Sequence, residues 1–462
     1  MRPTRRREFL RWSAASLTAL GLGGTPPFLR QTLAAPSISG KKLLFIFLRG
    51  GIDAVQAVIP YGDQGRAGAG IKTYLEARPT LGVPTNLAHD LNGFASLHPA
   101  VQSSDSEDSP QLASIFNGTV DERGPQLAIL HRIGYESQNR SHFSSQQFWE
   151  NGVPGAVQLE SGVFNNYLTA YPQPEAALRA ATLGKDQAVL LKGQVLTPVL
   201  RSVDEFALPS NVPLGSVPTE SNPAGLSLKG LYGQSEFNTR IPYEALTYST
   251  GAALLDNLQF FEDTVRNAPY SPEPDAQPYY GAIADRAFAE SVINSARLLK
   301  QVSDVEITGC NQDGYDTHGG EDTRFPILMR DLSLALTALY HDLKPLWDDT
   351  LVMTLSEFGR TSSENGNLGT DHGEATAMFM MGGSVLGGVY NCDPSTWDHG
   401  DLFSTPNGRY VSHRTDFRAV YHEVITRHFG DPEGRIDTII PGYTELSDAD
   451  AAGYLEPLGF LA

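Results

Sequence analysis

Short apolar runs that alternate with stretches of helical periodicity constrain the fold of this chain more than any other feature. Each run is too short for a buried helix and long enough for a strand buried on both faces. The predicted strands are residues 42–48, 126–131, 188–191, 305–308, 351–355 and 375–381. The predicted helices are residues 141–152, 243–266, 279–303, 325–347 and 416–429. This alternation is typical of an α/β fold, with a mainly parallel central sheet flanked by helices.

The length of 462 residues allows one large domain or two to three ordinary ones. No internal repeat or linker divides the chain after residue 35, so the sequence predicts a single domain over residues 36–462. The 45 glycines and 30 prolines indicate long loops. They are dense around residues 60–125 and 153–240, where we expect loop-rich insertions.

The charge is divided unevenly along the chain. Residues 1–35 contain six arginines and one glutamate, whereas the whole chain has a formal net charge of -19. The body after residue 35 is therefore strongly acidic. Nucleic acid and anionic membrane surfaces are polyanions, so they are excluded as the main partners.

The first 35 residues are predicted to be an export signal. Arg5, Arg6 and Arg7 precede an apolar stretch at residues 12–23, and small residues follow at 32–35. This order resembles a twin-arginine signal peptide, which implies the twin-arginine export machinery as a partner and a periplasmic or secreted protein. The alternative is a basic N-terminal helix on a cytoplasmic protein. No apolar run is long enough for a stable membrane span.

Two cysteines, Cys310 and Cys392, exclude a disulfide scaffold and a zinc site of four thiolates. The sequence leaves open whether these two pair or remain separate buried thiols.

Residues that bear carboxylate, imidazole or hydroxyl groups follow or precede the predicted strands and helices. In open α/β sheets, ligands gather at the carboxyl ends of the strands. Carboxylate and imidazole groups together suit Zn, Mn or Fe, and carboxylates alone suit Mg or Ca. The sequence therefore predicts a divalent metal of unknown identity: Zn, Mg, Mn or Ca. The candidate ligands are Asp53, Asp316, His318, Glu357, Asp371 and His372.

A second group of candidate residues is expected to act on the substrate or to bind it. Ser141 begins a predicted helix, where it is either an N-cap or a nucleophile, and His142 follows it. Arg360 either pairs with Glu357 or binds an anionic substrate. Asp53 is either a metal ligand or a helix N-cap, because an aspartate after a glycine turn such as Gly50 and Gly51 is often an N-cap.

Five segments together resemble a large family of twin-arginine-exported bacterial proteins within the alkaline phosphatase and sulfatase superfamily. They are LLFIFLRGGIDAVQAVIP, RSHFSSQQFWENG, GYDTHGG, LVMTLSEFGRT and GTDHGEATAMFMMGG. The resemblance implies an alkaline phosphatase-like α/β fold with metal ligands at the carboxyl edge of its sheet. It places Asp53, Asp316, His318, Glu357 and His372 at metal-ligand positions and Ser141 at the nucleophile position.

The chain departs from the superfamily pattern at Phe358, where the superfamily has histidine. An alternative alignment gives that role to Asp371 and His372. Arg140 stands where some phosphatases have aspartate. One metal ion, or two held mainly by oxygen, is therefore expected instead of a two-zinc site.

The resemblance implies an exported metal-dependent hydrolase of phosphate or sulfate esters, whose substrate is a small anionic ester. Ser141 would attack, while Arg360 or His142 would neutralise the ester oxygens or protonate the leaving group. The alternative is a non-catalytic periplasmic binding or assembly protein that retains the fold.

Overall fold

The protein is described here from a computed structural model. The described residues are 40–62, 72–101, 110–157, 159, 161–173, 176, 178–204, a few positions between 227 and 259, and 260–462. The predicted export signal lies outside them, as do parts of both predicted loop-rich insertions and most of the predicted helix at residues 243–266.

The described part of the chain contains a nine-stranded sheet in the order β11-β5-β10-β9-β1-β8-β6-β7, with β12 also paired to β5. Every pairing is parallel except those of β10, which runs antiparallel to both β9 and β5. The α/β class is confirmed, and the sheet is mixed and not purely parallel. The strands are β1 (Lys42–Leu48), β5 (Leu127–Gly134), β6 (Ala180–Leu183), β7 (Val199–Leu200), β8 (Ile307–Gln312), β9 (Thr350–Leu355), β10 (Thr376–Gly382), β11 (Gly388–Tyr390) and β12 (Thr415–Asp416).

Strand β1 lies in the middle of the sheet and is buried along its whole length. Its side chains alternate between two hydrophobic clusters, as strand geometry requires. Leu44, Ile46 and Leu48 join the cluster on one face, and Leu43, Phe45 and Phe47 join the cluster on the other. An unbroken apolar run is therefore needed here, because both faces of the strand are covered.

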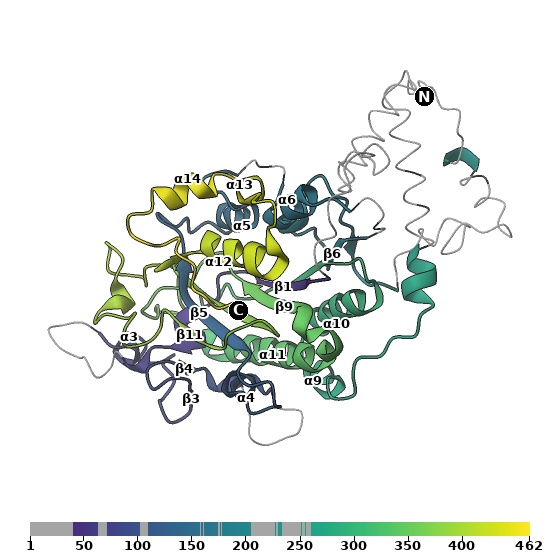
Figure 1. The fold of residues 1–462 in the computed structure, drawn as a ribbon. Helices are drawn as coiled ribbons and strands as arrows, with labels where there is room; N and C mark the ends of the chain where they lie inside the picture. The colour runs from purple at the N-terminus through teal and green to yellow at the C-terminus, as the bar shows by residue number, and fades with distance from the viewer. Residues whose placement is uncertain are drawn as a thin grey trace, which may run out of the picture.

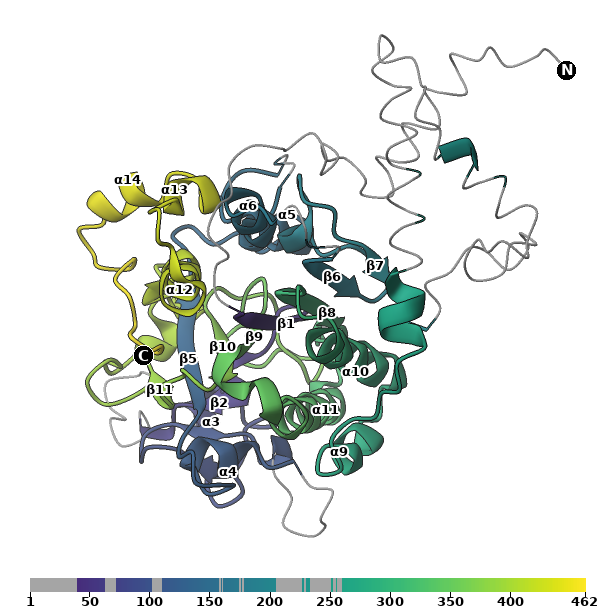
Figure 2. The same ribbon diagram turned by 45° about the vertical axis from the view of Figure 1, so that its right-hand side comes forward.

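Helices cover both faces of the sheet, as Figures 1 and 2 show. One face carries α4 (Leu112–Asn117), α9 (Gln277–Ala282), α10 (Arg286–Gln301) and α11 (Glu321–Asp342). The other carries α5 (His142–Asn151), α6 (Val163–Ala170), α12 (Phe417–Glu423), α13 (Ile436–Ile439) and α14 (Tyr443–Asp448). The short helices α2 (Ala54–Ala57) and α3 (Tyr74–Ala77) accompany a small antiparallel sheet of β2 (Val58–Ile59), β4 (Ser96–Leu97) and β3 (His89–Asp90).

Three sequence predictions of local structure need correction. The single helix expected at 279–303 is instead the end of α9 followed by α10, with Ile283 and Asp285 capping the two helices. Residues 188–191 were expected to form a strand, but Val189–Leu191 form a 3-10 turn whose leucines pack into a hydrophobic cluster. The helix expected at 416–429 is α12 followed by a π-helical stretch, Val424–Gly430. A short apolar run specifies burial, and its backbone conformation depends on which partner is available.

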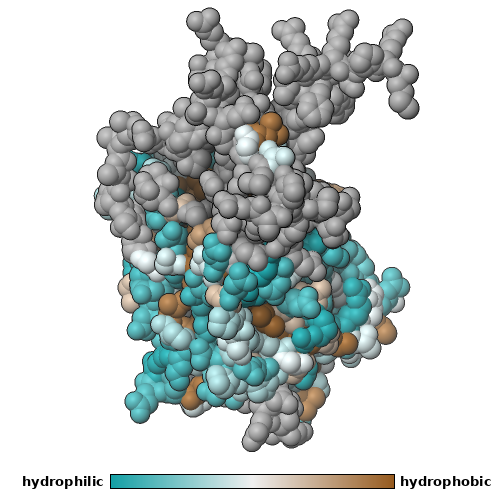
Figure 3. All heavy atoms as spheres, turned by 90° about the vertical axis from the view of Figure 1, so that its right-hand side faces the viewer, coloured by the Kyte–Doolittle hydropathy of each residue, from teal (hydrophilic) through white to brown (hydrophobic). Residues whose placement is uncertain are grey.

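Cys310 and Cys392 are both buried and form no disulfide. Among the helices that the structure describes, none combines the length and apolarity that crossing a bilayer requires. The face turned to the viewer in Figure 3 is mostly hydrophilic where it is coloured, with scattered hydrophobic residues.

Three buried histidines predict how stability depends on pH. Burial lowers the pKa of each of His98, His131 and His428 from 6.5 to about 4. Between these values the unfolded chain binds protons that the folded chain does not, so the free energy of unfolding rises with pH. We expect stability to fall steadily as pH drops from about 6.5 to about 4, measured by urea unfolding. A His428→Asn variant should show a shallower decline, and a flat profile in the wild type would contradict the prediction.

Candidate functional site

The predicted site residues lie on loops that leave one edge of the sheet. The loops after β1, β5, β8 and β9 leave the carboxyl ends of parallel strands. His372 precedes its strand, β10, and a parallel strand would have placed it at the opposite edge. Because β10 is antiparallel, its beginning lies beside the end of β9. Arg360 and His372 continue this pairing as an isolated antiparallel bridge.

Two glycines bring the first of these loops close to the others. A Cβ atom on Gly50 would lie 2.4 Å from the backbone nitrogen of Asp316, and one on Gly51 would lie 2.5 Å from the Phe358 ring. Both glycines also have positive φ angles, 115° and 75°. Only glycine meets both demands, which explains the Gly-Gly pair at this edge of the sheet.

Asp316 lies at the centre of the cluster. Its Oδ1 atom is 3.1 Å from His318 Nε2, 3.2 Å from His372 Nε2 and 3.5 Å from His142 Nε2. One ligand atom from each of His142, Asp316 and His372 lies within 4.8 Å of the others. His318 Nε2 is also 2.9 Å from His372 Nε2. Three imidazole nitrogens therefore converge on one carboxylate oxygen.

The opposite ring nitrogens of His142 and His372 face hydrogen-bond acceptors. His142 Nδ1 lies 2.8 Å from Glu357 Oε1, and His372 Nδ1 lies 2.8 Å from the carbonyl oxygen of Arg140. An acceptor at Nδ1 places the proton there and leaves Nε2 with its lone pair in the neutral ring. Metal-binding histidines are held in the same way.

His318 repeats this arrangement. Its Nδ1 atom lies 3.1 Å from Asp371 Oδ1, which also accepts a hydrogen bond from the Asn365 side chain. In all three histidines, Nδ1 thus faces an oxygen and Nε2 faces the cluster. Two neutral rings whose Nε2 atoms lie 2.9 Å apart cannot both accept a hydrogen bond from each other, so a cation or a proton between them is favoured.

The spacing of these atoms fits a small transition-metal ion. Zinc is bound by histidine nitrogen at about 2.0–2.1 Å, so neighbouring ligand atoms in a tetrahedral site lie about 3.3 Å apart. The distances from Asp316 Oδ1 to the three Nε2 atoms bracket that value. His142 Nε2 is buried and has no hydrogen-bond partner, which leaves it available as a ligand.

Glu357 is fully buried behind His142. Its Oε1 atom accepts hydrogen bonds from the Gly50 backbone (3.0 Å) and the Gln146 side chain (2.9 Å), besides facing His142. Burial favours the neutral acid, but hydrogen bonds led by those from His142 and Gln146 outweigh it and hold the pKa of Glu357 below its usual value. The ionised carboxylate is thus positioned to orient His142.

Two of the histidines next to Asp316, His142 and His372, have pKa values that are shifted in opposite directions. The hydrogen bond to Glu357 is the main reason why the pKa of His142 is raised. The pKa of His372 is lowered, mainly by burial and also by the charges of Arg360 and His142. His372 therefore tends to be neutral, while a proton and a metal ion compete for His142 Nε2.

Arg360 supports the cluster from inside the protein. Its Nη2 atom is 2.6 Å from Asp316 Oδ1, and its side chain has no exposed surface. Burial of Asp316 alone would raise its pKa, but the hydrogen bond and charge of Arg360 dominate and lower it to about 2. The guanidinium group also donates to the carbonyl oxygens of Gly50, Gly51, Tyr315 and Thr370. Because the Arg360 side chain has no exposed surface and most of its donors are used inside the protein, it is poorly placed to bind a substrate.

Asp53 is held by partners other than the three histidines. It is the N-cap of α2, where it accepts a hydrogen bond from the Gln56 backbone, and it forms an ion pair of 2.7 Å with the fully buried Arg78. Burial would raise the pKa of Asp53, but the charge of Arg78 lowers it, while burial and the Asp53 charge raise the pKa of nearby Glu321. This placement favours a structural role for Asp53 over metal binding.

Ser141 occupies the N-cap position of α5, directly before His142, but its side chain makes no capping hydrogen bond. Its backbone N–H is instead held by the Asn139 side chain at 2.8 Å. The residue is exposed. Its hydroxyl group is therefore not committed to the helix end.

Sequence reasoning missed several residues around the cluster. Gln146 lies four residues after His142, so helical spacing could have placed both on one face. Gln138 and Ser145 donate to the Glu357 carbonyl oxygen at 3.0 and 2.7 Å. No sequence signal links Arg78 to Asp53.

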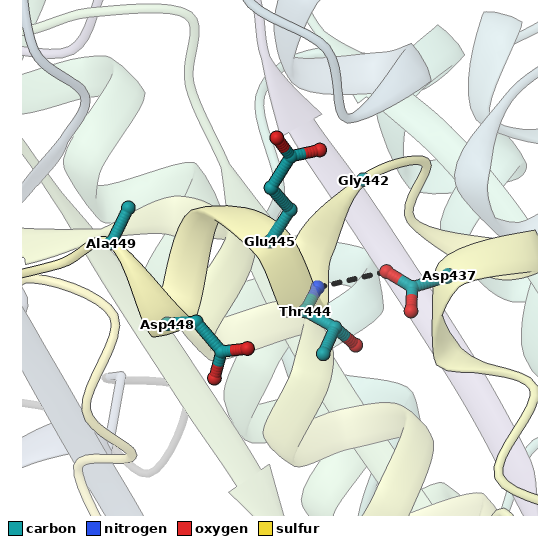
Figure 4. A pocket seen from close by; sticks show the side chains of 6 residues that line it. All are labelled: Asp437, Gly442, Thr444, Glu445, Asp448 and Ala449. Atoms are coloured by element: carbon teal, nitrogen blue, oxygen red, sulfur yellow. Dashed lines mark hydrogen bonds between the residues drawn. The ribbon is translucent and has the colours of Figure 1, made fainter.

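A separate acidic hollow lies at α13 and α14. It is lined by Asp437, Gly442, Thr444, Glu445, Asp448 and Ala449, and Figure 4 shows the hydrogen bond from the Thr444 backbone to Asp437. None of the predicted site residues lines it.

The fold and the cluster define an α/β protein with a histidine-rich candidate metal centre at one edge of a mixed sheet. Over residues 223–429 the chain is similar to a family described as "Protein of unknown function (DUF1501)". This match spans Asp316, His318, Glu357, Arg360, Asp371 and His372 and leaves Asp53, Ser141 and His142 outside. No curated protein matches the chain.

Proposed function

We propose that the chain is a metal-dependent hydrolase of phosphate or sulfate esters with an alkaline phosphatase-like fold. One observation carries the proposal: three imidazoles, each held through Nδ1 by an oxygen, direct Nε2 toward Asp316 Oδ1 beside the start of α5. The export signal predicted from the sequence at residues 1–35 would take the protein through the twin-arginine machinery to a periplasmic or secreted location.

His142, Asp316 and His372 would hold the metal ion, with His318 as a further ligand. Three imidazoles and one carboxylate suit Zn, Mn or Fe better than Mg or Ca, which prefer oxygen. When bound, such an ion polarises an ester oxygen and lowers the pKa of a coordinated hydroxyl group. Glu357 and Asp371, predicted from the sequence to be ligands, are assigned the task of orienting His142 and His318.

Ser141 supplies the nucleophile. Its hydroxyl oxygen would form a bond to phosphorus or sulfur and lose its proton to water, while the bond to the departing alcohol oxygen breaks and that oxygen gains a proton from water. A second water molecule would then hydrolyse the serine ester, releasing phosphate or sulfate and restoring the hydroxyl group. The backbone N–H groups in the first turn of α5 stabilise negative charge on the transferred group. Arg140 precedes Ser141, and its backbone carbonyl oxygen lies 2.8 Å from His372 Nδ1.

A specific observation favours the second candidate, a non-catalytic binding protein. Arg360 already neutralises Asp316, and the Phe358 ring packs against His142 and His372 at 4.9 and 4.8 Å. If Arg360 and Phe358 close the cluster in this way, the protein would keep the fold but bind no metal ion.

Metal removal distinguishes the two candidates. We expect the protein purified in folded form to contain about one transition-metal ion per chain by elemental analysis and to hydrolyse an aryl phosphate or an aryl sulfate. A chelator should abolish turnover, and zinc or manganese should restore it where magnesium does not. Protein that contains no metal and shows no turnover under any of these conditions would exclude the hydrolase.

A further inference from the structure

Two half-exposed arginines lie on one aromatic ring beside the histidine cluster. The guanidinium carbons of Arg140 and Arg409 are 4.9 and 5.5 Å from the centre of the Tyr410 ring. Their side chains are 40% and 57% exposed, whereas Tyr410 is 4% exposed. A buried ring that holds two accessible cations is a rigid platform for them.

Each arginine is tied to the cluster through a carboxylate. Arg140 Nη1 pairs with Glu374 at 2.9 Å, two residues from His372. Arg409 Nη2 is 3.8 Å from Asp371 Oδ2, and the other oxygen of Asp371 faces His318. Both contacts are exposed, and pairs of this kind add little to stability, so the two guanidinium groups can exchange partners at small cost.

The local charge would favour an anionic ligand once the proposed metal ion is bound. With the histidines neutral, three guanidinium groups face four carboxylates, which leaves one net negative charge. The divalent ion of the proposed function would change this local charge to one net positive charge, in a protein whose overall charge is -19. The groups counted are Arg140, Arg360 and Arg409 against Asp316, Glu357, Asp371 and Glu374.

Of the three arginines, Arg360 has no exposed surface, whereas Arg140 and Arg409 are accessible to a ligand from solvent. We propose that Arg140 and Arg409 bind a second anionic group on the substrate, a carboxylate, sulfate or phosphate remote from the ester that is cleaved. The preferred substrates are then esters that carry an additional negative charge. This inference rests on the proposed function, because it assigns the substrate class of the same site.

Binding of non-hydrolysable analogues tests the inference without turnover. The probes are ω-phosphonoalkanoates of increasing chain length, each compared with the alkylphosphonate of equal length, by calorimetry on the protein as purified. We expect at least one phosphonoalkanoate to bind about tenfold more tightly than its matched alkylphosphonate, as expected for one charge-assisted hydrogen-bonded pair.

Arg409→Gln should remove this preference, and Arg409→Lys, which keeps the charge, should retain part of it. Arg201→Gln is the matched control, because Arg201 is exposed and follows β7 at the edge of the sheet. Thermal unfolding of each variant checks that it is folded.

Each outcome decides the inference separately from the hydrolase proposal. Equal affinity for the paired analogues in the wild type, no binding of either, or a preference that persists in Arg409→Gln would overturn the second anion site. A protein that shows the preference and yet hydrolyses no ester would retain the anion site and fail as a hydrolase.

Discussion

Ser141→Ala should lower kcat for an aryl phosphate or sulfate by about three orders of magnitude or more, since a lost nucleophile in an assembled site costs at least this much. The hydroxyl group makes no helix-cap bond, so its removal should leave the free energy of unfolding within about 0.5 kcal/mol of wild type. The metal content should also be unchanged, because Ser141 is not among the proposed ligands. Steady-state kinetics, elemental analysis and urea unfolding measure the three quantities.

Ser144→Ala is the matched control, because Ser144 lies in the first turn of the same helix, α5, and is only partly buried. It should retain wild-type turnover. If Ser141→Ala retains most of its activity while Ser144→Ala also does, the nucleophile assignment is wrong, and a metal-bound water becomes the better candidate for attack.

Arg78→Met should lower the free energy of unfolding by about 3–5 kcal/mol, the usual cost of breaking a buried ion pair by removing one partner. Arg78 and Asp53 are both fully buried and lie 2.7 Å apart. The arginine also donates to the carbonyl oxygens of Thr361 and Ser362, so its loss leaves those groups unpaired as well. Chemical denaturation measures the effect.

A double variant separates the buried charge from the lost packing. Asp53→Asn combined with Arg78→Met removes both charges, and it should be more stable than Arg78→Met alone. Arg435→Met, on a side chain that is 39% exposed, should change stability by less than about 1 kcal/mol. A small effect of Arg78→Met on the free energy of unfolding would contradict the prediction. It would mean that Asp53 takes up a proton when Arg78 is lost and remains buried at little cost.

The sequence predicted three central strands well because each is an apolar run with polar turns at its ends. Residues 42–48 match β1, and the runs at 351–355 and 375–381 match β9 and β10 to within one residue. The run predicted at 305–308 overlaps β8 by only two residues, because β8 continues through less apolar residues to Gln312. The direction of β10 could not be predicted, because a strand buried on both faces has the same residue pattern whichever way it runs. Residues 188–191 were predicted to be a strand because a short buried apolar run has the same residue pattern in a strand and in a buried turn.

The sequence indicated which residues would gather at the candidate site better than it indicated how they would be arranged there. Asp316, His318 and His372 come together as expected, from turns at one edge of the sheet. The sequence could not distinguish a residue that faces the cluster from one that stands behind it, so Glu357 and Asp371 were both counted as ligands. The carboxylate of Asp53 is paired with a buried arginine 25 residues later, and sequence spacing alone does not reveal this pairing.

The backward course of β10 has a consequence for how the protein is made. During synthesis the polypeptide emerges from its amino end, and the last imidazole of the cluster, His372, comes just before that strand. Strand β5, which precedes His142, joins the rest of the sheet only through β10 in the described sheet order. Until β10 pairs with β5 and β9, the sheet therefore does not hold His142 close to Asp316. Capture of the proposed metal ion should therefore follow completion of the sheet, and a nascent chain released before residue 382 should be unable to retain that ion.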